Sequence, residues 1–229
     1  MRNLICISMV GWVLSACSGS DAPNFGPETE PTAGQRSAIT STSQDLALLA
    51  RADVQGQQAG SAAISFAFIA QGLLADGTTA RSLPELSGAA RAMALTDCGV
   101  VGPNSVVWNH CTDSNGYTID GTLSWSPGHV DVDLHVTSTQ SLAFTYSFTG
   151  SMTTSATAID GDMTVAYSIT SGGTTYSESI RSQIDVQLIN GCISNGTLTV
   201  TETGSGPGTR SGAVQVIWTG CNAFRVRNA

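Results

Sequence analysis

The sequence predicts an α+β fold in which an apolar N-terminal helix packs on a curved, half-barrel-like antiparallel meander sheet. Three observations predict this fold. Residues 43–95 have mainly helical periodicity, residues 98–228 alternate between apolar and polar side chains, and short Gly-rich joints separate the alternating runs. A sheet whose strands share one apolar face needs a cover, and the nearly all-apolar segment 59–75 is expected to supply it.

The first residues are typical of an export signal. A positive charge at Arg2 precedes the apolar run Leu4–Leu14, which is too short to span a membrane. The run ends in Leu14-Ser15-Ala16-Cys17, which resembles the lipobox of bacterial lipoproteins. This resemblance implies that residues 1–16 are a signal peptide, cut before Cys17, and that the Cys17 thiol carries a lipid anchor. Because Ser18 follows the cysteine, the pattern is similar to that of lipoproteins kept in the outer membrane.

The segment after the cysteine is predicted to be a tether. Residues 17–40 are rich in Pro, Gly, Ser, Thr and Glu and contain almost no apolar run, a composition typical of flexible linkers. Residues 41–229 are predicted to form a single globular domain, with a helical part at 43–95 and an antiparallel sheet at 98–228.

Two helical stretches are expected at the start of this domain. Apolar residues recur at helical spacing over 43–75, with a kink or a break near Gly56 and Gly60. Ser82-Leu83-Pro84-Glu85 then fits a capping box, so that a short helix is predicted from Pro84 to Leu95.

The rest of the domain is predicted to be strands joined by hairpins. Val100-Val101 and Val106-Val107-Trp108 flank a turn signal, and four longer runs alternate strongly: 129–136, 141–149, 162–170 and 176–189. One apolar and one polar face per strand indicate a sheet that is wet on one side. A recurrent glycine is interpreted as marking strand starts, at Gly121, Gly150, Gly161, Gly196 and Gly212.

Four cysteines remain for the folded domain once Cys6 and Cys17 are set aside, and in an oxidising compartment they can pair in three ways. Spacing favours Cys98–Cys111, at the open end of the first hairpin. It also favours Cys192–Cys221, which meet when the last hairpin folds about its Gly-rich loop with a single bulge. Because no Cys-x2-Cys pair is present, no metal site is expected here.

Three clusters contain residue types that can do chemistry. The first is His129, Asp131, Asp133 and His135, on one face of a predicted strand. Neighbours on one strand face lie about 6.6 Å apart, so that one metal ion could contact two of these side chains but not four. The pattern therefore favours a solvated strand face over a metal site or an acid–base pair.

The other two clusters are weaker signals. Asp113, Asn115 and Gly116, followed by Asp120, faintly suggest a calcium loop but lack several EF-hand ligands, so that a simple turn is preferred. Trp108, His110 and Trp125 could stack on a sugar or an aromatic ligand, although packing is the commoner role of such residues.

Composition and motifs restrict the function. The net charge is −8, all nine cationic side chains are Arg, and they form no basic cluster, so that nucleic-acid binding is not expected. Without a nucleophile elbow, a metalloprotease motif, a phosphate loop or a dinucleotide fingerprint, no catalytic residue and no cofactor are assigned.

The sequence thus predicts a membrane-anchored envelope lipoprotein that acts as a non-enzymatic structural or interaction module, with another envelope protein as a partner. Two alternatives stay open. A carrier for a hydrophobic ligand such as a lipid would need a cavity between the sheet and the 59–75 helix. An enzyme would need a pocket in which His110, His129 or His135 meets a carboxylate.

Overall fold

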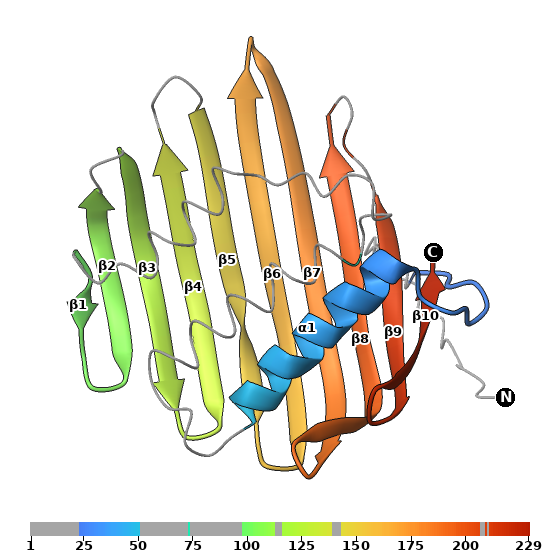
Figure 1. The fold of residues 1–229 in the computed structure, drawn as a ribbon. Coiled ribbons are helices and arrows are strands. Elements are labelled where there is room, and N and C mark those ends of the chain that lie inside the picture. The colour runs from blue at the N-terminus through green and yellow to red at the C-terminus, as the bar shows by residue number, and fades with distance from the viewer. Residues whose placement is uncertain are drawn as a thin grey trace, which may run out of the picture.

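The chain folds around one large antiparallel sheet. The computed structural model describes residues 23–50, 73, 98–112, 116–138, 143–206, 209 and 211–229. Within these residues ten strands form a meander in which each strand pairs with the next, and one helix, α1 (Ala33–Leu49), lies obliquely across one face of the sheet (Figure 1). The first and last strands do not pair with each other, so the sheet is open.

The strands lengthen toward the middle of the sheet. They are β1 (Val100–Val101), β2 (Ser105–Thr112), β3 (Tyr117–Ser126), β4 (His129–Ser138), β5 (Ala143–Thr154), β6 (Ala158–Ser171), β7 (Thr174–Ile189), β8 (Cys192–Ser205), β9 (Gly212–Gly220) and β10 (Ala223–Asn228). The predicted antiparallel meander is confirmed, and so is the first hairpin, in which Val100 pairs with Val107 and Val101 with Val106.

The face of the sheet that α1 covers, called the inner face below, is the hydrophobic core. Along β4 the even-numbered side chains from Val130 to Val136 are at most 4% exposed, whereas the odd-numbered ones are half-buried or exposed. Phe148, Val186 and Val216 continue this buried surface across the sheet with no exposed area. Burying one such side chain stabilises the fold by roughly 1.5–3 kcal/mol. The opposite side is called the outer face.

Helix α1 begins at Ala33 and not near Ser43, where the sequence analysis placed the first helix. A complete capping box starts it: the Gln35 backbone N–H donates to Thr32 Oγ1 at 3.2 Å, and the Thr32 N–H donates to Gln35 Oε1 at 3.0 Å. Two fully buried side chains, Ile39 and Leu46, attach the helix to the core. The prediction was wrong because these two anchors lie among Ser, Thr and Gln, which produce no continuous apolar stripe.

Helix α1 is also not the apolar helix that was expected to cover the sheet. The predicted segment 59–75 lies outside the described residues except for Leu73, which is helical and buried, and the short helix predicted from Pro84 to Leu95 lies outside them as well.

The predicted tether is too long, because its second half belongs to the fold. The Gly26 N–H donates to the Asn228 carbonyl at 3.0 Å, and Thr29 pairs with Val226 through two backbone hydrogen bonds of 2.8 and 3.1 Å. Ion pairs join Glu28 to Arg227 at 2.6 Å and Glu30 to Arg225. Residues 26–30 therefore cover the β10 edge of the sheet, and the boundary at residue 41 is wrong. A polar, Pro-containing composition gives no hint of edge pairing, since backbone groups make most of the contacts.

The recurrent glycines do not mark strand starts, apart from Gly212. Gly121, Gly150, Gly161 and Gly196 lie inside β3, β5, β6 and β8, at positions that face inward. Gly196 has a φ of +117°, and a Cβ at this residue would lie 2.2 Å from the backbone oxygen of Asp185 on the neighbouring strand. Glycine is required there because the strand bends and approaches its neighbour closely.

Both predicted disulfide pairings are confirmed. Cys98 and Cys111 are bonded with a Cα–Cα distance of 5.7 Å, and Cys192 and Cys221 with a distance of 5.6 Å. The bulge expected in the last hairpin lies elsewhere. The β8–β9 register is regular from Gly196 to Glu202, and the extra residue is Ser194, on the side of β8 that pairs with β7.

Candidate functional site

The outer face of the central strands contains two parallel rungs of small polar side chains. Each rung crosses β4 to β8 at positions that are direct cross-strand neighbours. The first rung consists of His135, Ser147, Ala166, Ser179 and Thr203. The second consists of Thr137, Thr145, Ser168, Ser177 and Ser205. Neighbours within a rung are about 4.8 Å apart, and the two rungs are about 6.6 Å apart, because these are the spacings of a β-sheet.

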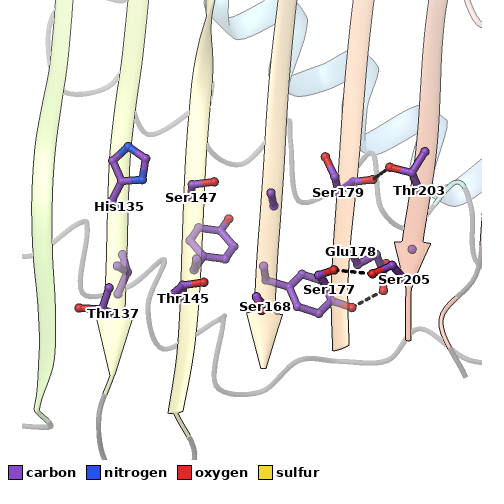
Figure 2. A pocket seen from close by; sticks show the side chains of 15 residues that line it. His135, Thr137, Thr145, Ser147, Ser168, Ser177, Glu178, Ser179, Thr203 and Ser205 are labelled. Atoms are coloured by element: carbon purple, nitrogen blue, oxygen red, sulfur yellow. Dashed lines mark hydrogen bonds between the residues drawn. The ribbon is translucent and has the colours of Figure 1, made fainter. Parts of the chain in front are cut away.

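These two rungs line a shallow depression, called the hydroxyl trough below, with a volume of about 560 Å³. Figure 2 views it from the outer face, with the labelled Ser, Thr and His side chains of the rungs in view and α1 behind the sheet. The volume lies within the range of small-molecule sites, about 300–1,000 Å³, although most such sites have apolar walls. Eight of the ten rung residues are Ser or Thr, so that hydroxyl groups line the trough, although carbon atoms make up most of its exposed wall.

Many of these hydroxyl groups are free to bind a ligand. Ser177 and Ser205 share a hydrogen bond of 3.0 Å, and Thr203 donates to the Ser179 carbonyl at 3.5 Å (Figure 2). The side chains of four further rung residues make no hydrogen bond to any part of the chain that the structure describes: Thr137, Thr145, Ser147 and Ser168. A hydroxyl can both donate and accept, so each of these groups offers a partner to a polar ligand.

Two further rows of cross-strand neighbours lie on the outer face beyond the first rung, on the side away from the second rung. They contain charged side chains. Asp133 and Arg181 belong to the adjacent outer row, and Asp162 to the next one. The Arg181 guanidinium donates through Nε and Nη2 to the Asp162 carboxylate, and this contact raises the pKa of Arg181. Charged side chains are thus concentrated next to the trough, whose own lining contains one carboxylate, Glu178, and one imidazole, His135.

The four residues predicted to share a strand face do so, on the outer face of β4, but they form two separate pairs. His129 Nε2 lies 2.9 Å from Asp131 Oδ2, and His135 Nε2 lies 3.1 Å from Asp133 Oδ1. In the described part of the chain no group of three or more His, Cys, Asp or Glu residues is arranged to hold a metal ion. Both pairs are exposed, which agrees with a solvated strand face.

A third His–Asp pair joins β2 to β3. His110 has a φ of +51° at the point where the β2–β3 register shifts, beside the Cys98–Cys111 disulfide. Asp120 accepts the His110 backbone N–H at 2.7 Å and contacts the His110 ring at 3.1 Å. The backbone hydrogen bond, assisted by the ring, lowers the pKa of Asp120. The carboxylate therefore stabilises a backbone conformation that few non-glycine residues adopt.

Asp120, His135 and Ser147 are successive cross-strand neighbours, and together they contain the residue types of a Ser–His–Asp catalytic site. The geometry of that site is not formed. No hydrogen bond joins His135 to Ser147 among the described residues, and the His135 Nε2 atom contacts Asp133 instead. The backbone N–H groups around Ser147 belong to the ladder that pairs β4, β5 and β6, so they are not available as an oxyanion hole.

The structure does not bring Trp108, His110 and Trp125 together. Trp108 is 4% exposed on the inner face and Trp125 is partly buried on the same face, whereas the His110 ring is exposed beside Asp120. The stacking alternative is therefore not formed, because the register shift in β2 turns His110 to the other side, and the two tryptophans pack as preferred. Of the calcium-loop alternative, residues 113–115 lie outside the described residues, and Asp120 is engaged by His110.

Behind the trough, on the inner face, the polar groups are paired or buried. The Tyr167 hydroxyl donates to the Glu178 carboxylate, and burial raises the pKa of Tyr146. The strand register places Glu178 in the inner row, and its carboxylate is paired with Tyr167, although the residue also lines the trough.

The sequence analysis found only one residue of the trough, His135. The signal for the others was present as Ser and Thr at alternate positions of each strand. It became a site only through the register of five strands, which aligns these residues into rungs.

Comparisons with protein-family models, with curated proteins and with solved structures found no match to this chain. Among the described residues no helix is both long and apolar enough to cross a membrane. The function therefore has to be inferred from the residues and from their arrangement.

Proposed function

We propose that this chain is an exported bacterial lipoprotein, anchored to the outer membrane through Cys17, whose folded domain is a non-enzymatic interaction module. The observation that supports this proposal is the contrast between the two faces of the sheet. The side chains of the inner face are buried, while the outer face presents a broad polar surface with a trough in its centre. A protein that works through contact needs such an exposed, stable platform.

The position of the N-terminal segment supports a short link between the proposed lipid on Cys17 and the folded domain. Because the chain already pairs with β10 from Gly26 onward, only residues 18–25 lie between the proposed lipid and the sheet. Eight extended residues reach at most about 28 Å, so the domain would stay close to the membrane surface. The outer face would then be held in the space next to the membrane.

The carrier alternative gains no comparable support from the described residues. Leu134, Phe148 and Val186 line the inner face and have no exposed surface. The cavity that a carrier would need lies between the sheet and the 59–75 segment, which is outside the described residues apart from Leu73.

The proposal can be tested on the full chain produced in a bacterium that acylates lipoproteins. We expect radiolabelled palmitate to be incorporated into the wild-type chain and not into a Cys17→Ser variant. Equal labelling of both chains, or labelling of neither, would rule out the anchor.

The folded domain is tested by native mass spectrometry of the same protein extracted in detergent. We expect the mass of the acylated chain with two disulfides and no further lipid. A non-covalent lipid adduct that is lost on denaturation would instead favour the carrier.

A further inference from the structure

We propose that the hydroxyl trough binds a neutral glycan chain. This inference rests on the proposed function, because it names the ligand class for the same outer face. The ligand class follows from three properties of the trough, which are its charge, its hydrogen-bonding groups and its length.

The charge of the trough selects against ionic ligands. Its lining contains one imidazole, His135, which contacts Asp133, and one carboxylate, Glu178, which accepts a hydrogen bond from the Tyr167 hydroxyl. The chain as a whole has a net charge of −8, which repels anionic polymers such as nucleic acids. A cationic ligand would be drawn to the neighbouring carboxylates of Asp133 and Asp162 and not to the hydroxyl groups.

The hydrogen-bonding groups select against an apolar ligand. Covering the trough with an apolar surface would bury the hydroxyls of Thr145, Ser147 and Ser168 without partners, at a cost of roughly 1–3 kcal/mol each. A polyhydroxylated ligand avoids this cost because every sugar hydroxyl both donates and accepts, as the hydroxyls of Ser and Thr do.

The length of the trough suits a chain and not a single sugar. The rungs extend over five strands, a distance of about 19 Å at the spacing of a β-sheet. Their regular spacing offers the same pair of hydroxyl rows at each step, as a repeating polymer would require. An extended glycan that crosses the strands from β4 to β8 could therefore contact both rungs along its length.

The test is affinity electrophoresis in native gels that contain a neutral soluble polysaccharide, with dextran, laminarin, galactomannan and hydroxyethyl cellulose used one at a time. The sample is the full lipidated chain in a detergent without a sugar head group. The negative net charge drives the protein through the gel, so that slower migration reports binding to an uncharged polymer. We expect at least one polysaccharide to slow the wild-type protein.

Two variants place a charge in the trough, Ser168→Glu in the second rung and Ser179→Glu in the first. We expect each to weaken the apparent affinity about tenfold, which corresponds to the loss of one or two hydrogen bonds. The matched control is Thr199→Glu, which lies on the same face between Gln183 and Gln215 and outside the trough. We expect this control to bind like the wild type.

Because a glutamate changes the size of the side chain as well as its charge, a second variant removes hydroxyls without adding charge. Ser147→Ala combined with Ser179→Ala should weaken the binding while the urea unfolding midpoint stays within the error of the wild type. Unchanged migration of the wild type in all four polysaccharides would overturn the proposal, and so would equal binding by the trough variants and Thr199→Glu. Neither result affects palmitate labelling at Cys17, so that failure of the glycan assignment is distinguishable from failure of the proposed anchor.

Discussion

The two faces of the sheet are built from the same strands, yet they differ in almost every physical property. On the inner face large apolar side chains such as Tyr146 and Phe148 are excluded from water, whereas the neighbouring outer positions of β5 carry Ser and Thr. The inner face therefore contributes most of the stability, and the outer face can vary in chemistry at little energetic cost. This separation allows a binding surface to exist on a sheet without weakening its core.

The largest effect on stability is expected when an inner side chain is truncated. The matched comparison is truncation of the outer side chain that follows it on the same strand. Phe148→Ala should lower the free energy of unfolding by about 3–5 kcal/mol, because it leaves a cavity in the core. Thr149→Ala, one residue further along β5, should cost less than about 1 kcal/mol. Urea unfolding followed by tryptophan fluorescence measures both, and similar losses would mean that the two faces do not differ as described.

The next effect concerns a glycine that faces inward. Gly196→Ala should cost at least about 2 kcal/mol, because its φ of +117° is unfavourable and the new Cβ would overlap the Asp185 carbonyl. The control is Gly173→Ala, which also has a positive φ but has open space around it, so that its cost should be about 1 kcal/mol. If both variants lose the same stability, the close approach of β8 to β7 is not what requires glycine.

A smaller effect is expected at the helix that covers the inner face. Thr32→Ala removes the side-chain acceptor of the capping box and should lower the free energy of unfolding by about 1 kcal/mol. Thr32→Ser keeps the hydroxyl and should restore most of the loss. An Ala variant as stable as the wild type would show that the helix is held by Ile39 and Leu46 alone.

The smallest effect is a pH dependence on the outer face. Because the folded-state pKa of Asp120 is lowered from 3.8, its contact with His110 stabilises the fold above that pH and is lost as the pH falls through the lowered pKa. Asp120→Asn should therefore be somewhat less stable than the wild type at pH 7, lose less stability on acidification, and approach the wild-type stability below about pH 4. His110→Asn keeps the backbone donor and should retain most of the dependence. Identical acid unfolding of wild type and Asp120→Asn would contradict this account.

The sequence predicted the inner face well, because burial imposes a strict two-residue alternation that can be recognised in each strand alone. It also predicted both disulfides, since hairpin spacing brings Cys192 near Cys221. Features that depend on neighbouring segments were missed. The edge contact of Thr29 with Val226 joins residues 197 positions apart, and the inward glycines have a role only in relation to the adjacent strand.

The candidate site was the least predictable part for the same reason. A Ser or Thr on an outer strand position carries no signal by itself, and Ser168 became part of a trough only because Thr145 and Ser177 lie beside it. His135 attracted attention through its residue type, although it lies at one end of the trough and not at its centre. Register, which follows from all the hairpins together, is the information that single strands lack.

The central claim, that one face is a closed core and the other is an open surface, can be tested most directly by a glutamate scan along β5. Each position from Phe144 to Thr149 is changed to Glu in turn, and the urea unfolding midpoint is measured. The account predicts a two-residue alternation, in which the variants at Phe144, Tyr146 and Phe148 fail to fold and those at Thr145, Ser147 and Thr149 unfold near the wild-type midpoint. Equal destabilisation at outer and inner positions would contradict it, because the outer face would then also be covered by protein.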